Sequence, residues 1–310
     1  MFYGGRWSLC TLFSELPDCQ TLMKPAPFAY YAPESLDEAL ALRAEHAADS
    51  VLLSGGQSLV PMLNLRLSQP SVVIDLNRVQ GLGGIAESNG GLAVGALTRQ
   101  RAAERSSLVA ERAPLLAKAL PLIAHPAIRS RGTVGGSLAH CDPAAELPAV
   151  MLALDAKLVA RSVSGGERVI EAADFFEGFL TTSLREDEIL TEVRVPGSPA
   201  GAGAAFHEVS RNHGAFAIVG AGCVVHAHEG TVEDVRLVFI GAGGTPMRAR
   251  AAESALTGQP ATAESFAAAA RDAAAELEPS SDVHASAKYR LNVAEVLARR
   301  ALTEALEVSA

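Results

Sequence analysis

Two short glycine-rich segments carry the residue types best suited to chemistry in this 310-residue chain. They are LLSGGQS at positions 52–58 and RGTVGGS at positions 131–137, and each adjoins apolar residues that should form a strand or begin a helix. A glycine doublet lets the backbone approach a ligand closely, so that successive N–H groups can converge on phosphate oxygens. One such loop alone is most simply a turn. Two in one domain favour a pyrophosphate, which has two phosphoryl groups to be held. Hydroxyl groups flank both doublets, at Ser54, Ser58, Thr133 and Ser137.

The common nucleotide motifs do not account for these loops. The dinucleotide fingerprint G-x-G-x-x-G fails in the segment 201–206, where Phe206 takes the sixth position, and the segment 241–244 lacks the third glycine. No G-x-x-x-x-G-K-[ST] loop for ATP occurs in the sequence. The predicted phosphate site therefore belongs to an architecture other than the Rossmann fold or the P-loop.

Cysteine and histidine patterns do not predict a metal centre on this chain. His226 and His228 share one face of a predicted strand, but no third ligand is evident nearby. His140, Asp142 and Glu146 are interpreted as contacts of a loop or a cofactor rather than as catalytic acids or bases. We predict no catalytic residue and no metal ligand, and we expect iron–sulfur chemistry on another chain. The chain has four cysteines, Cys10, Cys19, Cys141 and Cys223, and none of them belongs to a C-x-x-C pair.

Composition indicates an acidic, folded protein. At 49% hydrophobic and 20% charged residues the chain can bury a large core, and a formal net charge of -9 argues against a nucleic-acid partner. Apolar stretches such as 215–225 are shorter than the ~20 residues that span a bilayer, so we predict no transmembrane segment and a cytoplasmic location. Residues 1–22 lack the continuous apolar centre of a signal peptide. They are expected to be a disordered or mis-started extension.

The elements that must position the two loops begin with an alternation of helix and strand. Ser35 or Glu34 is expected to cap a helix that ends before Asp49, and a strand at 51–53 leads into the first glycine loop. Paired glycines at 90 and 91 predict a hairpin over 84–97. Thr98 is expected to begin a helical region that runs to Arg105. The remaining predicted elements of this half are an apolar segment at 59–67, strands at 72–75, 157–163 and 189–195, and helices at 109–123 and 144–154.

The second half is predicted to be a separate domain. The segment PGSPAGAG at 196–203 is the clearest linker by composition. Three strands followed by three helices predict an α+β fold class for the chain, with a three-stranded sheet and helices in the C-terminal domain. These strands are expected at 204–210, 216–228 and 232–240, and the helices at 247–256, 261–277 and 284–306.

Four separated segments, in this order, give the chain a specific resemblance to a known family. They are GGQSLVPMLNLRL at 55–67, HPAIRSRGTVGGSLAHCDPAAELPAV at 125–150, DFFEGFLTTSLREDEILTEVRVP at 174–196 and RNHGAFAIVGAG at 211–222. From about Met23 to its C-terminus the chain resembles the medium, FAD-binding subunits of aerobic carbon monoxide dehydrogenase and related molybdenum hydroxylases. The flavin domain of xanthine dehydrogenase is the same module.

The resemblance implies two domains and their boundaries. A two-lobed FAD-binding domain of the vanillyl-alcohol-oxidase (PCMH) type would span 23–198, with lobes of about 23–78 and 79–198. A C-terminal α+β domain of the CO-dehydrogenase flavoprotein type would span 204–308.

The resemblance also implies which residues hold FAD. Glu146 is expected against the adenosine part, and Leu190 is expected to pack on the cofactor. Ile123 falls close to the flavin ring, at a position that is aromatic in the xanthine enzymes, and His207 falls where relatives can carry a lysine near the cofactor. The two loops would hold the pyrophosphate, the first through Leu52, Leu53, Ser54, Gly55, Gly56, Gln57, Ser58 and Leu59, the second through Thr133, Val134, Gly135, Gly136 and Ser137.

By the same resemblance the chain is an oxidoreductase subunit that transfers electrons through FAD. It would receive them from a small iron–sulfur subunit with two clusters and pass them to NAD or a quinone, while substrate reacts at the molybdenum cofactor of a large subunit. The expected assembly is a dimer of heterotrimers, cytoplasmic or associated with the inner face of the membrane.

Two other function classes stay open for comparison. A free-standing FAD-dependent oxidase or dehydrogenase with its own substrate pocket would need an acid or base over the flavin ring, or a covalent flavin anchor. No motif for either occurs in the sequence. A scaffold that has lost its flavin is disfavoured because both glycine doublets are intact.

Overall fold

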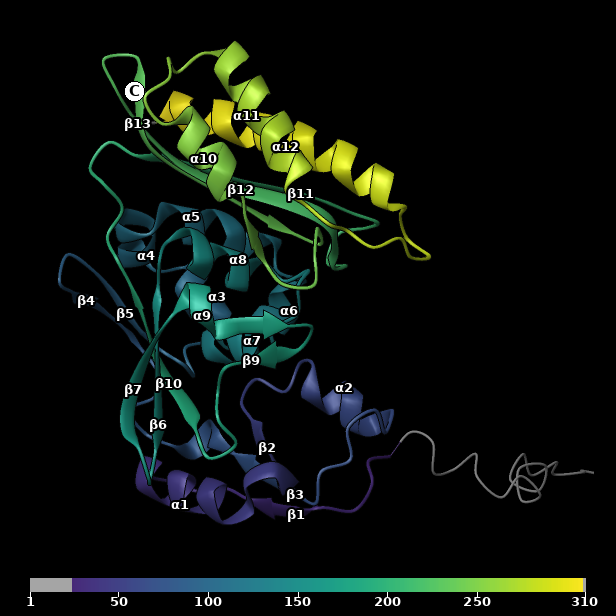
Figure 1. The fold of residues 1–310 in the computed structure, drawn as a ribbon. Helices are drawn as coiled ribbons and strands as arrows, with labels where there is room; N and C mark the ends of the chain where they lie inside the picture. The colour runs from purple at the N-terminus through teal and green to yellow at the C-terminus, as the bar shows by residue number, and fades with distance from the viewer. Residues whose placement is uncertain (1–23, 309–310) are drawn as a thin grey trace, which may run out of the picture.

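The computed structural model describes residues 24–308 of the chain. The predicted extension over residues 1–22 lies outside this range. No helix among the described residues is long and apolar enough to cross a membrane. Figure 1 shows an N-terminal lobe at the bottom, a middle lobe above it and a C-terminal domain at the top, and the mixture of helices and strands confirms the predicted α+β class.

A three-stranded parallel sheet organises the N-terminal lobe, with the strand order β1-β3-β2. Ser35 accepts the backbone N–H of Glu38 and so caps the first helix, as predicted. Because β2 and β3 are parallel, the segments that follow them, 54–58 and 76–78, leave the same edge of the sheet. The lobe consists of β1 (Ala29–Tyr31), α1 (Leu36–His46), β2 (Ser50–Leu53), α2 (Leu59–Asn64) and β3 (Val72–Asp75).

An antiparallel sheet of order β4-β5-β10-β6-β7 forms one side of the middle lobe. The hairpin predicted around Gly90 joins β4 to β5. Strand β7 was not predicted, because its GERVIE sequence contains no apolar run and most of its residues are exposed. The five strands are β4 (Ile85–Ser88), β5 (Gly91–Gly95), β6 (Lys157–Ser162), β7 (Gly166–Glu171) and β10 (Ile189–Val195).

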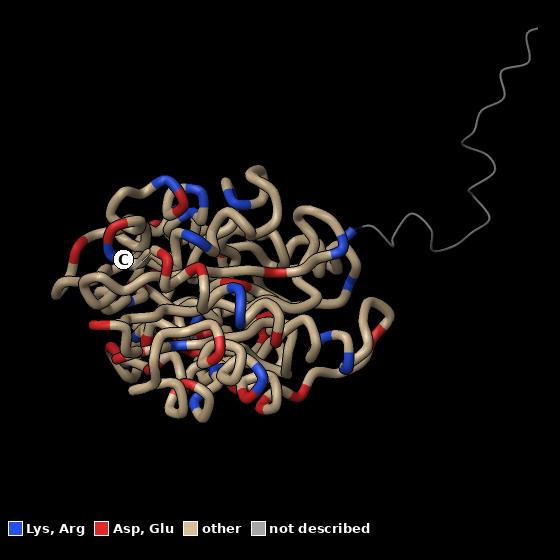
Figure 2. Tube along the Cα trace, turned by 90° about the horizontal axis from the view of Figure 1, so that it is seen from above, with Lys and Arg blue, Asp and Glu red and all other residues tan. Residues whose placement is uncertain are grey.

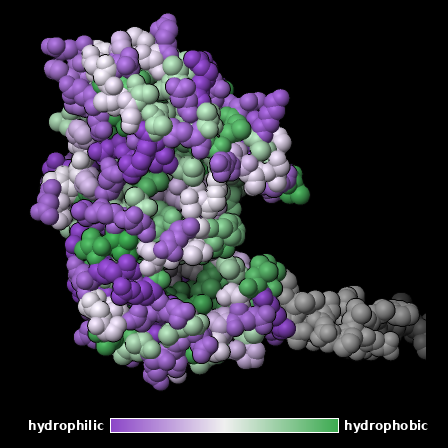
Figure 3. Space-filling model, viewed as in Figure 1, coloured by the Kyte–Doolittle hydropathy of each residue, from purple (hydrophilic) through white to green (hydrophobic). Residues whose placement is uncertain are grey.

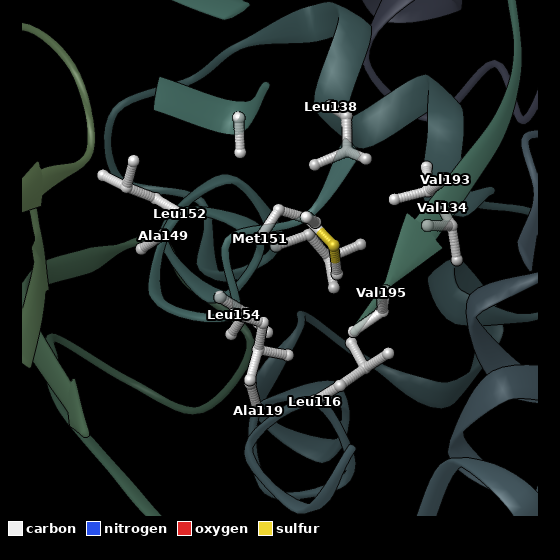
Figure 4. Close-up of a cluster of buried hydrophobic side chains, with 14 of the residues drawn as sticks. Leu116, Ala119, Val134, Leu138, Ala149, Met151, Leu152, Leu154, Val193 and Val195 are labelled. Carbon is white, nitrogen blue, oxygen red and sulfur yellow. The ribbon is translucent and has the colours of Figure 1, made fainter. Parts of the chain in front are cut away.

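Short helices pack on this sheet and bury an apolar core. In Figure 4 the labelled side chains of α5, α7, α8 and β10, among them Leu116, Leu138, Met151 and Val193, point toward one another. Thr98 does not begin the first helix as predicted, because its Oγ1 donates to Gly84 O at 2.8 Å and α3 starts at Gln100. The elements are α3 (Gln100–Glu104), α4 (Ser107–Arg112), α5 (Pro114–Ala119), α6 (Pro126–Arg129), α7 (Val134–His140), α8 (Glu146–Ala153), α9 (Ala172–Phe175) and the small hairpin of β8 (Phe176–Gly178) and β9 (Thr181–Thr182).

The C-terminal domain is an antiparallel sheet of order β11-β12-β13-β14 with three helices on one face. The three predicted long strands and three predicted helices are present. The segment from Met247, expected to start a helix, instead pairs with β13 as a short fourth strand, and the helix begins at Arg250. The elements are β11 (Gly203–Ser210), β12 (Ala217–His228), β13 (Thr231–Ile240), β14 (Met247–Arg248), α10 (Arg250–Leu256), α11 (Ala263–Ala275) and α12 (Ala287–Val308).

Both faces of this C-terminal sheet are buried. Val219 and Phe239 belong to the core beneath α10, α11 and α12. Phe206 and Val238 belong instead to the core of the middle lobe, which also contains the side chains of α5 and α8. The C-terminal domain and the middle lobe therefore share one hydrophobic core. Seen from above in Figure 2, acidic and basic residues are interspersed along the chain rather than sorted onto separate faces.

Candidate functional site

The two glycine loops lie in direct contact with each other. A Cβ added to Gly55 would lie 2.7 Å from the backbone oxygen of Arg131, and one added to Gly136 would lie 2.5 Å from Ser54 Oγ. The hydroxyl of Thr133 donates to Ser54 Oγ at 3.2 Å. Segments that are about eighty residues apart in the sequence thus meet at backbone distance, and side chains at either glycine would separate them.

The first loop has a run of backbone N–H groups with no acceptor. Within residues 24–308, the N–H groups of Gly55, Gly56, Gln57 and Ser58 donate to no atom. Gly56 has a φ of +72°, in the left-handed region, and a left-handed residue in a turn lets neighbouring N–H groups point to one side. Since unpaired backbone donors near the protein interior are costly, a ligand with several acceptor oxygens suits this loop.

The second loop differs, because the backbone N–H groups of residues 134–137 already donate to acceptors inside the protein. Val134 and Gly135 donate to the carbonyl oxygens of Thr98 and Ala96, at 2.9 and 2.8 Å. Thr133 caps α7, since its Oγ1 accepts the N–H of Gly136 at 3.1 Å. The middle lobe therefore fixes the second loop in place, and the first loop rests against it.

A cavity of about 400 Å³ opens beside the first loop. Arg131 lines it, and among the described residues no carboxylate lies within ion-pair distance of its guanidinium. The molecule in Figure 3 is hollowed on the side where α2 faces the upper part of the structure, and apolar residues gather around the hollow. The walls of the cavity are Leu53, Ser54, Gly55, Gly56, Gln57, Val60, Pro61, Asp75, Asn77, Ile128 and Arg131.

The acidic wall residue Asp75 is held in its ionised form. Burial raises the pKa of this carboxyl, but hydrogen bonds from the Tyr30 hydroxyl at 2.6 Å and from Asn77 outweigh burial and hold the pKa below its usual range. The carboxylate is thereby committed to protein donors. Among the described residues, the donors of the cavity wall that no protein acceptor uses are the N–H groups of the loop and the guanidinium of Arg131.

Of the other residues expected at the cofactor, Ile123 and Leu190 are buried in the core of the middle lobe together with Val134 of α7. Neither lines the cavity beside the first loop. The structure therefore places them in the core of the middle lobe rather than around the cavity.

Glu146 lies at the first position of α8 and is buried, with 8% of its surface exposed. Burial, the nearby carboxyl of Glu208 and that of Asp142 raise the pKa of Glu146 to about 8. Burial also raises the pKa of Glu208 to about 7, and its Oε2 is buried without a hydrogen-bond partner. These two carboxyls are close enough to influence each other's charge, one on α8 of the middle lobe and the other on β11 of the C-terminal domain.

His207 is not brought to the glycine loops. Neighbouring residues of a strand point to opposite faces, so His207 faces α12 while Glu208 faces the middle lobe. The Nε2 of His207 lies 2.9 Å from Glu304 Oε2, in a separate cavity of about 510 Å³.

Two of the four sequence segments that carry the family resemblance meet in space. Gly214, between β11 and β12, has a φ of +85°, and a Cβ there would collide with the ring of His125. The rings of His125 and His213 meet edge to face with centroids 5.3 Å apart. Segment 125–150 and segment 211–222 are thus in contact. Among residues 24–308, no group of three or more His, Cys, Asp or Glu side chains could hold a metal ion.

Sequence reasoning missed Asn77, Arg99 and Glu208. Asn77 could have been found, because it follows a strand parallel to the one that leads into the first glycine loop. Arg99 and Glu208 belong to no motif, and only the fold brings them to the loops and to Glu146.

Comparisons with known proteins agree with this arrangement. The family model described as "FAD binding domain in molybdopterin dehydrogenase" matches residues 26–198, and the one described as "CO dehydrogenase flavoprotein C-terminal domain" matches residues 204–305. The 6-hydroxypseudooxynicotine dehydrogenase complex subunit alpha of Paenarthrobacter nicotinovorans is 44% identical over 285 residues, which is 92% of this chain and 96% of that protein.

Carbon monoxide dehydrogenase is represented by a sequence and by a solved structure. The medium chain of the Hydrogenophaga pseudoflava enzyme is 38% identical and covers 91% of this chain and 98% of its own length. A structure of the enzyme from that organism, lacking the Mo-pyranopterin moiety of the molybdenum cofactor, contains a chain that matches with a TM-score of 0.90 and 40% identity. The match covers 93% of this chain and 100% of that one.

Proposed function

Because this chain belongs to the FAD-binding medium subunits of the carbon monoxide dehydrogenase and xanthine dehydrogenase family, we propose that its glycine loops bind the FAD pyrophosphate within an electron-transfer subunit. The family consists of oxidoreductase subunits, and the cofactor of this chain is FAD. The proposal is carried by the unpaired backbone N–H groups of residues 55–58. Consecutive N–H groups in a glycine turn are a recurrent way to bind phosphate oxygens.

The residues present suit a pyrophosphate in charge as well as in shape. Arg131 lines the same cavity without an acidic partner among the described residues, so its guanidinium is available to an anion. The hydroxyls of Thr133 and Ser137 lie on the second loop, whose rigid backbone sets their position. Gly55 and Gly136 leave room only for backbone between the loops. Ile123, Glu146 and Leu190 are proposed to support the remainder of the cofactor from the middle lobe.

When bound, FAD supplies redox chemistry with one or two electrons at a time, which suits a relay from iron–sulfur clusters to an external acceptor such as NAD or a quinone. We propose that the clusters belong to a small partner subunit and that substrate is oxidised at the molybdenum cofactor of a large one. Two relatives, a "complex subunit alpha" and a "medium chain", support a multisubunit assembly. The proposed form is a dimer of heterotrimers in the cytoplasm, either free or associated with the inner face of the membrane.

The proposed domain boundaries are 23–198 for the FAD-binding domain, divided near residue 78, and 204–308 for the C-terminal domain. The ranges of the two family models support the division at the linker. The proposed role of this chain's own residues is to bind and orient the cofactor. No residue is proposed as a catalytic acid or base.

Absorption spectroscopy of the purified full chain with added FAD tests cofactor binding, and gel filtration of the natural assembly tests the partners. We expect flavin bands that stay with the protein, and co-purification with an iron–sulfur subunit and a molybdenum subunit. If the chain retains no flavin at saturating FAD, the proposed binding site is wrong. Turnover of a substrate by this chain alone would favour the free-standing oxidase or dehydrogenase and overturn the relay.

A further inference from the structure

Arg99 forms hydrogen bonds that reach toward both glycine loops. One terminal nitrogen of its guanidinium donates to the backbone oxygen of Arg131, at the start of the second loop, at 2.5 Å. The other terminal nitrogen donates to Asn77 Oδ1 at 2.6 Å. Both terminal nitrogens are therefore occupied by acceptors of the protein, whereas the guanidinium of Arg131 has no such partner among the described residues.

Asn77 completes the connection to the first loop. Its Nδ2 donates to the backbone oxygen of Ser54 at 2.8 Å and also to Asp75 Oδ1 at 2.5 Å. A continuous path of hydrogen bonds thus runs from the carbonyl of Ser54 through Asn77 and Arg99 to the carbonyl of Arg131. It joins the residue before the first glycine doublet to the start of the second loop.

The chemistry of the two side chains suits a rigid spacer. A guanidinium is planar and presents its donors as a fixed fork, so its two hydrogen bonds define a distance and an angle. The amide of Asn77 accepts from Arg99 through its oxygen and donates to the Ser54 carbonyl through its nitrogen at the same time. Burial lowers the pKa of Arg99, followed by the nearby charge of Arg131, yet an arginine keeps its charge at neutral pH.

We propose that Arg99 and Asn77 act as positioning residues that hold the two glycine loops at the separation required by a pyrophosphate. This inference rests on the proposed binding of FAD at the two loops. The pair acts on the distance between the loops, so it favours cofactors with two linked phosphates over nucleotides with one phosphate.

Three substitutions in the full chain test this role. Asn77→Ala removes the link to Ser54, and Arg99→Lys keeps the positive charge but loses the fork. Arg105→Gln is the control, because Arg105 lies just after α3 and its side chain forms no hydrogen bond or ion pair among the described residues. Dissociation constants for FAD, ADP and AMP are measured by calorimetry or by competition with FAD, and the melting temperature of the cofactor-free chain is measured in parallel.

We expect Asn77→Ala and Arg99→Lys each to weaken the binding of FAD and of ADP by about tenfold. This is the effect expected from the loss of one hydrogen bond to a charged group. AMP binding should change by less than about twofold, and Arg105→Gln should leave all three constants unchanged. The double variant should bind FAD nearly as well as the weaker single variant, because either change breaks the same path.

Several outcomes would overturn the positioning role. They are unchanged FAD binding in both variants, equal losses of affinity for FAD and for AMP, or losses of FAD affinity that add in the double variant. A variant with a lower melting temperature is judged by its ratio of ADP to AMP affinity, which general destabilisation leaves unaltered. If the unmodified chain itself fails to bind FAD, the proposed function fails instead.

Discussion

Gly55 is constrained by what lies next to it. A Cβ at this position would lie 2.7 Å from the backbone oxygen of Arg131, and backbone cannot move aside as cheaply as the end of a side chain. Gly55→Ala should therefore push the loops apart and weaken FAD binding by tenfold or more, on the order of 1.4 kcal/mol. Calorimetric titration with FAD measures the loss.

Gly83→Ala is a matched control for this change. A Cβ on Gly83 meets nothing within 4 Å, and its φ is not positive. Equal FAD affinity in the two variants would show that contact between the loops does not control binding.

The raised pKa values of Glu208 and Glu146 predict how the stability of the fold depends on pH. Both pKa values are raised, to about 7 and about 8, above the ordinary value of 4.5. The folded chain then binds more protons than the unfolded chain between pH 4.5 and 8, so stability falls as pH rises through this window. The nearby charge of Arg129 lowers the pKa of Glu146 but does not offset burial, and Arg129 is already paired with Glu104.

Glu208→Gln should remove much of this loss. We expect the variant to be more stable than the original chain at pH 8.5, on the order of 2 kcal/mol, and nearly equal to it at pH 4.5. Urea unfolding at several pH values measures the difference. A constant difference across that range would mean that Glu208 does not titrate in the folded protein as described.

At the scale of elements, Arg290 fastens the long helix α12 to the sheet. It is 8% exposed, and its guanidinium donates to the backbone oxygens of Ile218 and Gly241 and to Asp282. Arg290→Met takes the Arg290 donor away from two half-buried carbonyls and should lower the free energy of unfolding by about 2–4 kcal/mol.

Denaturant unfolding of Arg290→Met and Arg299→Met provides the comparison. Arg299 lies on the exposed side of the same helix, so its replacement should cost less than about 0.5 kcal/mol. Similar costs at both positions would contradict a specific attachment at Arg290.

The elements that local patterns determine were predictable from the sequence. Ser35 as a helix cap and the β-branched strand at 72–75 depend on neighbours in the chain, and both were predicted correctly. Thr98 was predicted wrongly as a helix start because its hydroxyl bonds to Gly84, a partner that only the fold supplies. The same limit applies to the site. The glycine doublets could be recognised in the sequence, but the hydrogen bonds of Arg99 and Asn77 that connect the two loops could not.

At the scale of the whole molecule, the shared core couples the C-terminal domain to the FAD-binding part. Phe206 and Val238 of the C-terminal sheet pack in the same cluster as the helices of the middle lobe. FAD bound at the loops should therefore stabilise the entire described chain. At free FAD of about 100 times its dissociation constant, the gain is about 2.7 kcal/mol.

Calorimetric melting with and without FAD tests this coupling. One transition should move to higher temperature as a unit. A second transition that stays in place when FAD is added would show that the C-terminal domain unfolds independently.

The difference between the two glycine loops also governs how fast their amide protons exchange with deuterium. An N–H group that donates to nothing can exchange without local unfolding, whereas a paired group must wait for the structure to open. Residues 55–58 of the cofactor-free chain should thus exchange early and residues 134–137 late. Added FAD should slow exchange in the first segment and leave exchange in the second nearly unchanged. Mass spectrometry of these two peptides therefore separates the half of the site that depends on the ligand from the half that the fold completes by itself.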